Sequence, residues 1–139
     1  MKLRQILAGA TLATLLLSAC GQAPEPADVS SGPPGAKPAV KIGAVTIVSH
    51  PSLDLIYEGV IEGLADAGYV QGENLTIELQ NPQGDQATLT SIANTYAASD
   101  NDLFVAIATP PAQAMAQVES QRPIVFASVT DPVAAGLVD

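Results

Sequence analysis

From Val40 onward the sequence predicts an α/β fold with a parallel, doubly wound sheet. Three features of the pattern indicate this fold. Short apolar runs rich in β-branched residues have the composition of buried strands, amphipathic segments with helical spacing lie between them, and the connections are short. Such alternation is typical of a sheet with helices on both faces, in which right-handed crossovers place the carboxyl ends of the strands along one edge.

The first predicted unit is a strand over residues 41–48, followed by a helix from Pro51 to about Ala67. The strand sequence, KIGAVTIV, is almost continuously apolar, as expected when both faces of the sheet are covered. Gly68 suits the end of the helix because glycine adopts a positive φ without strain. The helix has apolar side chains at helical spacing, namely Leu53, Ile56, Val60 and Leu64.

The second predicted unit is a strand over residues 74–80, in which apolar residues alternate, and a helix that begins after Asp85. Asp85 is a favourable N-cap because its carboxylate can accept a hydrogen bond from a free N–H group of the first turn. The apolar residues of this helix again share one face, namely Leu89, Ile92, Ala93 and Tyr96.

Two further strands complete the predicted sheet, one over residues 102–108 and the other over residues 124–128. The helix between them opens at Thr109-Pro110. Thr109 is a good N-cap candidate, and we expect Pro110 to lie in the first turn, where the missing N–H matters least.

Residues 1–19 have the three parts of a signal peptide. Lys2 and Arg4 precede an apolar run, Ile6–Leu17, of 12 residues, whereas a membrane-spanning helix needs roughly 20. The exit sequence LSAC, which ends at Cys20, resembles the bacterial lipobox, in which the cysteine is acylated and becomes the mature N-terminus. The alternative is an idle or buried cysteine after an ordinary signal peptide. We expect an exported lipoprotein, attached to the membrane through lipid only, that faces the periplasm or the extracellular side.

Residues 20–39 predict a disordered tether. They consist almost wholly of Gly, Pro, Ser, Ala and acidic residues, and such a segment cannot bury enough apolar surface to offset the entropy lost on ordering. Residues 40–139 then form the folded part, which has the size of one domain.

Composition excludes several kinds of function. A chain that begins at Cys20 keeps three basic residues against fourteen acidic ones, a net charge of −11, and such a surface repels nucleic acid and anionic lipid headgroups. One cysteine and one histidine exclude an intramolecular disulfide and metal sites built on several Cys or His ligands. Motifs of serine hydrolases and of nucleotide binding are missing from the sequence. We therefore expect no catalytic residues, no metal and no cofactor.

Ligands of open parallel sheets bind just outside the carboxyl ends of the strands. Four predicted loops meet this condition. They hold the histidine together with amides, hydroxyls and carboxylates, a set that suits a small zwitterion or another polar solute. These loops are residues 49–52, 81–86, 109–113 and 130–132.

The polar residues of these loops also have structural explanations. His50 can form a hydrogen bond with nearby backbone, and Asp85 and Thr109 can act as helix caps. Asp131 can cap a turn at Pro132, or it can be the counter-charge for the ammonium group of a ligand. The sequence alone leaves both possibilities open.

The folded part resembles the solute-binding lipoproteins of ABC importers associated with tryptophan and tyrosine uptake, over residues 40–139 almost continuously. The segments that carry the resemblance include SHPSLD at 49–54, NPQGDQ at 81–86, ATP at 108–110 and TDPV at 130–133. Pro111 departs from it, because a small residue such as alanine is expected there, and a proline removes a backbone donor from the start of the helix.

The resemblance implies the N-terminal lobe of a type I periplasmic-binding-protein-like fold, in which two lobes close on a ligand like a hinge. Such a fold has about twice the length of residues 40–139, so we expect this lobe to be truncated, without the second lobe, and to bind ligand weakly by itself. The ligand-contacting residues that the resemblance implies are Ser49, His50, Asn81, Gln83, Gly84, Ala108, Thr109, Pro110, Thr130 and Asp131.

The expected function is that of the solute-binding component of an ABC importer. It is a monomer that captures a small polar solute, an amino acid and by resemblance an aromatic one, and delivers it to the permease and ATPase subunits. The alternative is a lipid-anchored ligand sensor or interaction domain of the same fold. An exported α/β enzyme is a third possibility, which the missing motifs disfavour.

Overall fold

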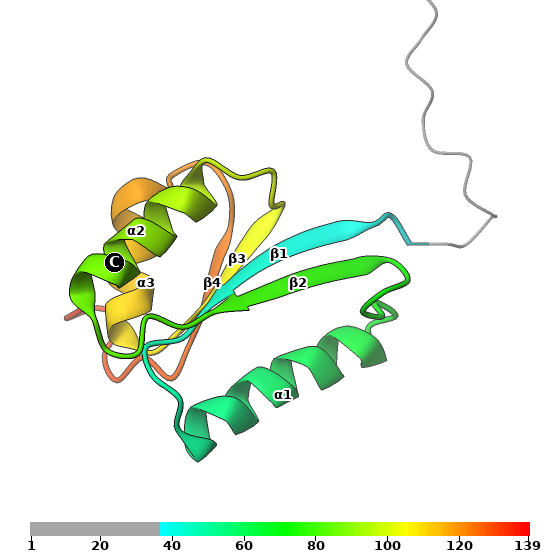
Figure 1. Cartoon of the computed structure of the whole chain (residues 1–139), viewed down its shortest axis with the longest axis horizontal. Coiled ribbons are helices and arrows are strands. Elements are labelled where there is room, and N and C mark those ends of the chain that lie inside the picture. The colour runs from blue at the N-terminus through cyan, green and yellow to red at the C-terminus, as the bar shows by residue number, and fades with distance from the viewer. Residues whose placement is uncertain (1–36) are drawn as a thin grey trace, which may run out of the picture. The chain divides into compact units, whose positions relative to one another are not determined.

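The computed structural model describes residues 37–139, which form a four-stranded sheet and three helices (Figure 1). The strands lie in the order β2-β1-β3-β4, and every neighbouring pair is parallel. The predicted α/β class and parallel sheet are thus confirmed. The elements are β1 (Val40–Val45), α1 (Pro51–Asp66), β2 (Leu75–Gln80), α2 (Gln86–Ala97), β3 (Leu103–Ile107), α3 (Thr109–Val118) and β4 (Ile124–Ala127).

The predicted signal peptide, Cys20 and most of the predicted tether lie outside the described residues. Within residues 37–139, no helix has both the length and the apolar character that are needed to cross a membrane.

Helices cover both faces of the sheet, but unequally. α1 packs against one face, and α2 and α3 pack against the other (Figure 1). Since successive strand residues point to opposite faces, β1 contributes Ala44 to the α1 side and Val45 to the α2/α3 side. α1 has no fully buried side chain. Val125 of β4, which is level with Val105 of the α1 side, is 53% exposed. The α1 side is therefore the more thinly covered face.

β1 is shorter than predicted, because it ends at Val45 and not at Val48. Its last residue is level with Gln80, the end of β2, so no further partner is available for the ladder on that side. The N–H of Thr46 still donates to Gln80 O at 3.1 Å, and Ile47 O then accepts from Gly84 N at 2.8 Å. The chain beyond Val45 is thus held by a loop and not by a strand.

The predicted starts of α1 at Pro51 and of α3 at Thr109 are confirmed. Gly68 follows α1 with a φ of +81°, and Asp85 is the N-cap of α2, where its side chain accepts from Thr88 N at 2.7 Å. The prediction that Thr109 caps α3 is wrong, because Ala108 occupies the N-cap position and Thr109 is the first helical residue. A single residue joins β3 to α3, so the turn has to be made by the backbone of Ala108, which has a φ of 87°.

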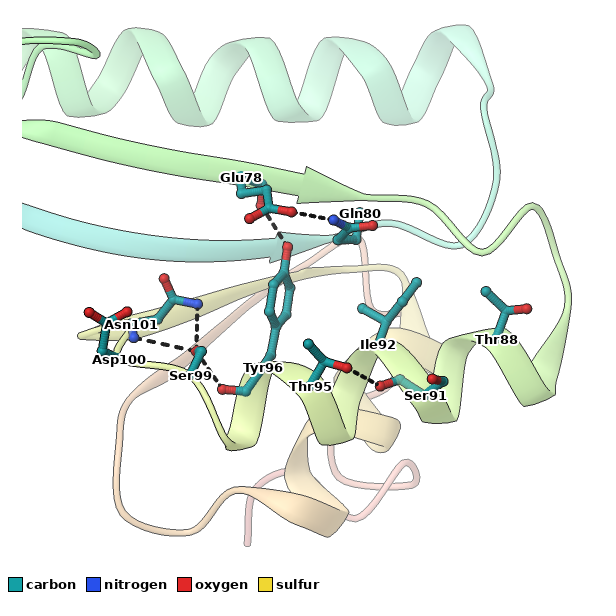
Figure 2. A pocket seen from close by; sticks show the side chains of 10 residues that line it. All are labelled: Glu78, Gln80, Thr88, Ser91, Ile92, Thr95, Tyr96, Ser99, Asp100 and Asn101. Carbon is teal, nitrogen blue, oxygen red and sulfur yellow. Dashed lines mark hydrogen bonds between the residues drawn. The ribbon is translucent and has the colours of Figure 1, made fainter.

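Gly43 allows α2 and the loop after it to approach β1 closely. Tyr96 rises from α2 to the sheet, where its hydroxyl lies 2.8 Å from Glu78 O and 3.1 Å from Ala44 O (Figure 2). A Cβ on Gly43 would lie 2.8 Å from Asn101 Nδ2 and 3.0 Å from Cδ1 of Phe104, and both distances are shorter than van der Waals contact. A Cβ at position 43 therefore requires the Asn101 and Phe104 side chains to shift.

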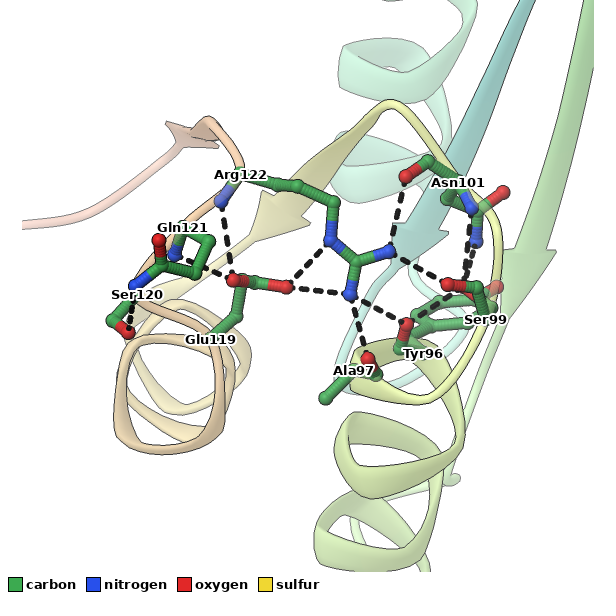
Figure 3. A network of polar contacts seen from close by, with 8 residues as sticks. All are labelled: Tyr96, Ala97, Ser99, Asn101, Glu119, Ser120, Gln121 and Arg122. Atoms are coloured by element: carbon green, nitrogen blue, oxygen red, sulfur yellow. Dashed lines mark hydrogen bonds and ion pairs between the residues drawn. The ribbon is translucent and has the colours of Figure 1, made fainter.

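Arg122 joins three elements at the edge where the strands begin (Figure 3). Its side chain pairs with Glu119 at 2.5 Å, and its guanidinium lies 4.7 Å from the centre of the Phe104 ring. Arg122 thus connects the end of α2, the start of β3 and the entry to β4. The guanidinium also donates to the carbonyl oxygens of Tyr96, Ala97, Ser99 and Asn101.

Glu119 holds the turn that leads into β4. Glu119 is 8% exposed, and its carboxylate accepts hydrogen bonds from Gln121 N at 2.6 Å and from Arg122 N at 3.1 Å. These backbone hydrogen bonds, together with the Arg122 side chain, lower the pKa of Glu119 from 4.5 to about 2. The folded protein therefore favours the charged form of this carboxyl group.

We predict that Gly43→Ala destabilises the fold by about 1–3 kcal/mol, because the new methyl group displaces the side chains of Asn101 and Phe104 from position 43. The matched control is Gly59→Ala in α1, where a Cβ meets nothing within 4 Å and alanine favours the helix by roughly 0.5–1 kcal/mol. Urea unfolding followed by circular dichroism measures both free energies. Equal effects of the two substitutions would contradict the close packing at Gly43.

We also predict that Glu119 makes the fold sensitive to acid. Because its folded pKa is below 4.5, its stabilising contribution is complete above pH 4.5 and is lost as the pH falls towards 2. The free energy of unfolding of Glu119→Gln should accordingly depend less on pH between 4.5 and 2 than that of the wild type. Glu62→Gln, a change at an exposed position on α1, should keep the wild-type pH dependence, and a Glu119→Gln curve of wild-type steepness would argue against this role.

Candidate ligand-binding site

Parallel pairing brings the four loops that follow the strands to one edge of the sheet. We call this edge the rim and define it as residues 46–50, 81–85, 108–110 and 128–132. The predicted convergence of these loops is confirmed by the strand directions. With strands about 4.8 Å apart, the ends of the outer strands β2 and β4 are separated by about 14 Å. The rim carries all ten implied contact residues: Ser49, His50, Asn81, Gln83, Gly84, Ala108, Thr109, Pro110, Thr130 and Asp131.

The strand order places a topological switch point between β1 and β3. After β1 the chain crosses to β2 by way of α1 on one face, whereas after β3 it crosses to β4 by way of α3 on the other face. The loops that leave β1 and β3 therefore diverge, and ligands of open α/β sheets bind at such a switch point. The switch point is the centre of the candidate site.

The loops that follow β1 and β2 are joined by side-chain hydrogen bonds. Ser49 Oγ accepts from Asn81 Nδ2 at 3.0 Å and from Gln83 Nε2 at 3.4 Å. Asn81 Oδ1 in turn accepts from Gln83 N at 2.9 Å. The structure therefore brings Ser49, Asn81 and Gln83 together, with Gly84 held beside them through its bond to Ile47 O.

His50 is the N-cap of α1. Its Nδ1 accepts from Ser52 N at 3.2 Å, which confirms that the imidazole is bonded to nearby backbone. An accepting Nδ1 carries no hydrogen in the neutral ring, so the proton resides on Nε2. The exposed imidazole can therefore cap the helix and still offer one N–H donor to a ligand.

The connection between β3 and α3 is strained. Ala108 has φ 87° and ψ 161°, a region that glycine adopts far more readily than alanine. Its N–H donates to Ala127 O at 2.9 Å, which fixes the turn. Because Pro110 and Pro111 have no N–H, the first turn of α3 offers the N–H of Thr109 as its backbone donor.

Backbone positions with a positive φ are concentrated at the rim. Of the described residues other than glycine, three have a positive φ, and each follows a different strand: Gln83 at 53°, Ala108 at 87° and Ser128 at 58°. Such conformations are costly and are concentrated at binding sites in many proteins. The rim thus has a feature of functional sites that the sequence pattern does not reveal.

Asp131 caps the turn that follows β4. Its Oδ1 accepts from Ala134 N at 2.9 Å, and Gln113 Nε2 of α3 donates to Ala135 O at 3.1 Å. The capping role proposed from the sequence is therefore present. Thr130 and Asp131 are both exposed, so the carboxylate can meet a ligand while it holds the turn.

Charge is distributed unevenly between the two edges of the sheet. The three basic side chains of residues 37–139 lie at the opposite edge, which we call the amino edge (residues 37–41, 67–74, 98–102 and 119–123). Lys37 contacts Ala67 O and the Tyr69 ring, Lys41 pairs with Asp100 at 2.5 Å, and Arg122 pairs with Glu119.

The charged side chains of the rim are those of Asp85 and Asp131. Hydrogen bonds from the side chain and the backbone of Thr88 lower the pKa of Asp85, so this carboxylate stays charged. The described part of the rim therefore favours a positively charged group and binds an anion only through N–H and O–H donors.

A hollow of about 310 Å³ lies away from the rim, along α2 and the edge strand β2 (Figure 2). Sequence reasoning did not identify it. Two of its polar side chains are bonded within the fold, since Thr95 Oγ1 donates to Ser91 O and the Tyr96 hydroxyl donates to Glu78 O. Burial of Tyr96 raises the pKa of its hydroxyl.

Comparison with known proteins identifies the family. The family described as ABC transporter substrate binding protein matches residues 41–139. A protein named tyrosine-binding protein from Clostridioides difficile (strain R20291) is 46% identical over 97 residues, which are 70% of this chain and 28% of the relative.

Two solved structures are also similar, and each covers 72% of this chain and 34% of its own. One is the ligand-free, open form of a substrate-binding protein with adhesive properties from Clostridium difficile, with 44% identity and a TM-score of 0.70. The other is an ABC domain in complex with L-Trp from Streptococcus pneumoniae, with 44% identity and a TM-score of 0.69. The chain spans about a third of the length of these proteins and belongs to the ABC transporter substrate binding protein family.

Proposed function

We propose that this chain supplies one lobe of the solute-binding component of an ABC importer, which captures an amino acid and passes it to a membrane permease. The observation that carries the proposal is the convergence of four polar loops on the rim of a member of this family. Members of a substrate-binding family bind and release solutes and in general do not transform them. The chain spans about a third of its solved relatives, so other parts of such a protein would complete the site.

The chemistry of the rim suits an amino acid. Asp131 is exposed at the end of β4 and would pair with the ligand ammonium group. The carboxylate would be bound by neutral donors, for which the N–H of Thr109 and the Nε2–H of His50 are available. The hydrogen-bonded group of Ser49, Asn81 and Gln83 would form the wall beside them.

An aromatic amino acid is the preferred ligand class, because one similar protein is named tyrosine-binding protein and another was solved in complex with L-Trp. The aromatic residues near the sheet are engaged in packing: Tyr96 lies against Phe104 with ring centres 6.0 Å apart, and Tyr69 lies against Lys37. Aromatic contacts to the ligand side chain would therefore come from residues outside this lobe.

The position of Lys37 is compatible with a lipid anchor at Cys20. Lys37 and the residues after it enter the sheet at the amino edge, which is the edge opposite to the rim. An anchored tether that joins the lobe there would leave the candidate site unobstructed.

The test of ligand binding is a titration of the purified chain with tyrosine and tryptophan, observed by NMR of the ligand. Because one lobe provides part of the contacts, we expect a dissociation constant on the order of millimolar. Binding of neither amino acid to the folded chain would contradict the proposed function.

We predict that Asp131→Asn weakens this binding by about 1.5–3 kcal/mol, since it removes a charge-assisted contact to the ammonium group. Asparagine keeps an oxygen that can accept from Ala134 N, so the turn should persist. Glu73→Gln, at an exposed position of the amino edge, is the matched control and should bind as the wild type does. An unchanged affinity for Asp131→Asn would leave Asp131 with its capping role alone.

We predict that Cys20→Ala releases the protein from membranes, because the thiol is the group to which a lipid would be attached. Stable anchoring needs two or more lipid signals, such as two acyl chains. Membrane fractionation of cells that express the wild type and the variant measures the change. A variant that remains with the lipid fraction would remove the anchoring proposal while leaving the ligand proposal intact.

A further inference from the structure

All three helices begin at the rim, and the start of α1 is closed to anions. A helix start ordinarily binds an anion through the free N–H groups of its first turn. In α1, Pro51 has no N–H, and Ser52 N donates to His50 Nδ1 at 3.2 Å. The next two N–H groups, those of Leu53 and Asp54, both donate to His50 O. The first turn of α1 therefore keeps no backbone donor for a ligand carboxylate.

The starts of α2 and α3 are also poor anion sites. In α2 the carboxylate of Asp85 accepts from Thr88 N at 2.7 Å, so a negative group of the protein already occupies the place that an anion would take. In α3 both Pro110 and Pro111 lack an N–H, which leaves the N–H of Thr109 as the backbone donor of that turn.

Side-chain charge at the rim favours a cation. The three basic side chains of residues 37–139 lie at the amino edge and are engaged there. Asp131 is exposed, and one of its two carboxylate oxygens accepts from Ala134 N, which leaves the other oxygen available. Asp54, in the first turn of α1, and Asp85 add further negative charge beside the rim. These carboxylates attract an ammonium group and repel a ligand carboxylate.

We infer that this lobe recognises the ammonium group of its ligand and not the carboxylate, so that aromatic amines without a carboxylate bind it about as well as aromatic amino acids do. The inference rests on the proposed function and narrows the ligand class of the same site. A compound that lacks the carboxylate loses the hydrogen bonds from Thr109 N and His50, but it also escapes repulsion by Asp131 and Asp85. The aromatic ring would be held by residues outside this lobe, so the head group decides what the lobe prefers.

The experiment titrates the purified chain with tyramine, L-tyrosine and N-acetyl-L-tyrosine, observed by NMR of the ligand at neutral pH. The three compounds share the phenol ring, and their head groups are cationic, zwitterionic and anionic. We expect the dissociation constant of tyramine to be at most about threefold above that of tyrosine. That of N-acetyl-L-tyrosine should be at least about tenfold above it, because a charge-assisted contact is lost. Tyramine should also displace tyrosine, since both occupy one site.

A pair of variants separates the rim from general attraction of a cation by an acidic protein. Asp131→Asn should raise the dissociation constant of tyramine by about tenfold. Glu73→Gln, which removes the same charge at an exposed position of the amino edge, should leave it within about twofold. Equal losses in the two variants would show non-specific attraction and would overturn the inference.

The remaining outcomes distinguish the inference from the proposed function. If tyrosine binds and tyramine binds more than tenfold more weakly, or if N-acetyl-L-tyrosine binds as tyrosine does, the lobe recognises the carboxylate. The inference then fails, and the amino-acid proposal stands. If neither tyrosine nor tryptophan binds, the amino-acid proposal fails. Tyramine binding that depends on Asp131 would in that case still support recognition of the ammonium group.

Discussion

The parallel pairing of β1 with both β2 and β3 is the constraint on which the rest of the structure depends. A parallel ladder forces each connection to return along a helix, so every strand ends at the same edge. Because β1 is central, the chain has to leave it towards one face and leave β3 towards the other. The topological switch point at the rim is a direct consequence of this order. The polar loops could not meet if one strand ran in the opposite direction.

The two edges of the sheet differ in charge pairing and in backbone strain. At the amino edge, Arg122 and Glu119 are paired and satisfied by backbone groups, and Lys41 is paired with Asp100. At the rim, the backbone is strained at Gln83, Ala108 and Ser128, and Thr46 has an unsatisfied hydroxyl. The paired charges thus lie at the amino edge, whereas the strained backbone positions lie at the rim.

Sequence reasoning predicted the elements better than the details of the site. Periodicity identified all four strands and all three helices of the described part, and Asp85 was recognised as a cap because its preference is local. The start of α3 at Thr109 was predicted, but the capping role of Thr109 was wrong, because the one residue between β3 and α3, Ala108, occupies the N-cap position. For Asp131 the capping role was one of two possibilities, and the bond to Ala134 N establishes it. The cluster around Arg122 was missed, since the carbonyl oxygens that Arg122 binds lie 21–26 residues away in the chain.

The sequence by itself determined the fold class, the set of loops at one edge and the acidic character of the chain, because these depend on local periodicity, composition and the general handedness of crossovers. Tertiary structure alone decided where β1 ends, which rim groups bond to one another, which backbone positions are strained and which buried hydroxyl has no partner. Those properties depend on register between strands and on distances between residues remote in the chain. Local preferences carry no information about either, so only the assembled sheet could reveal the switch point between β1 and β3 and the buried hydroxyl of Thr46.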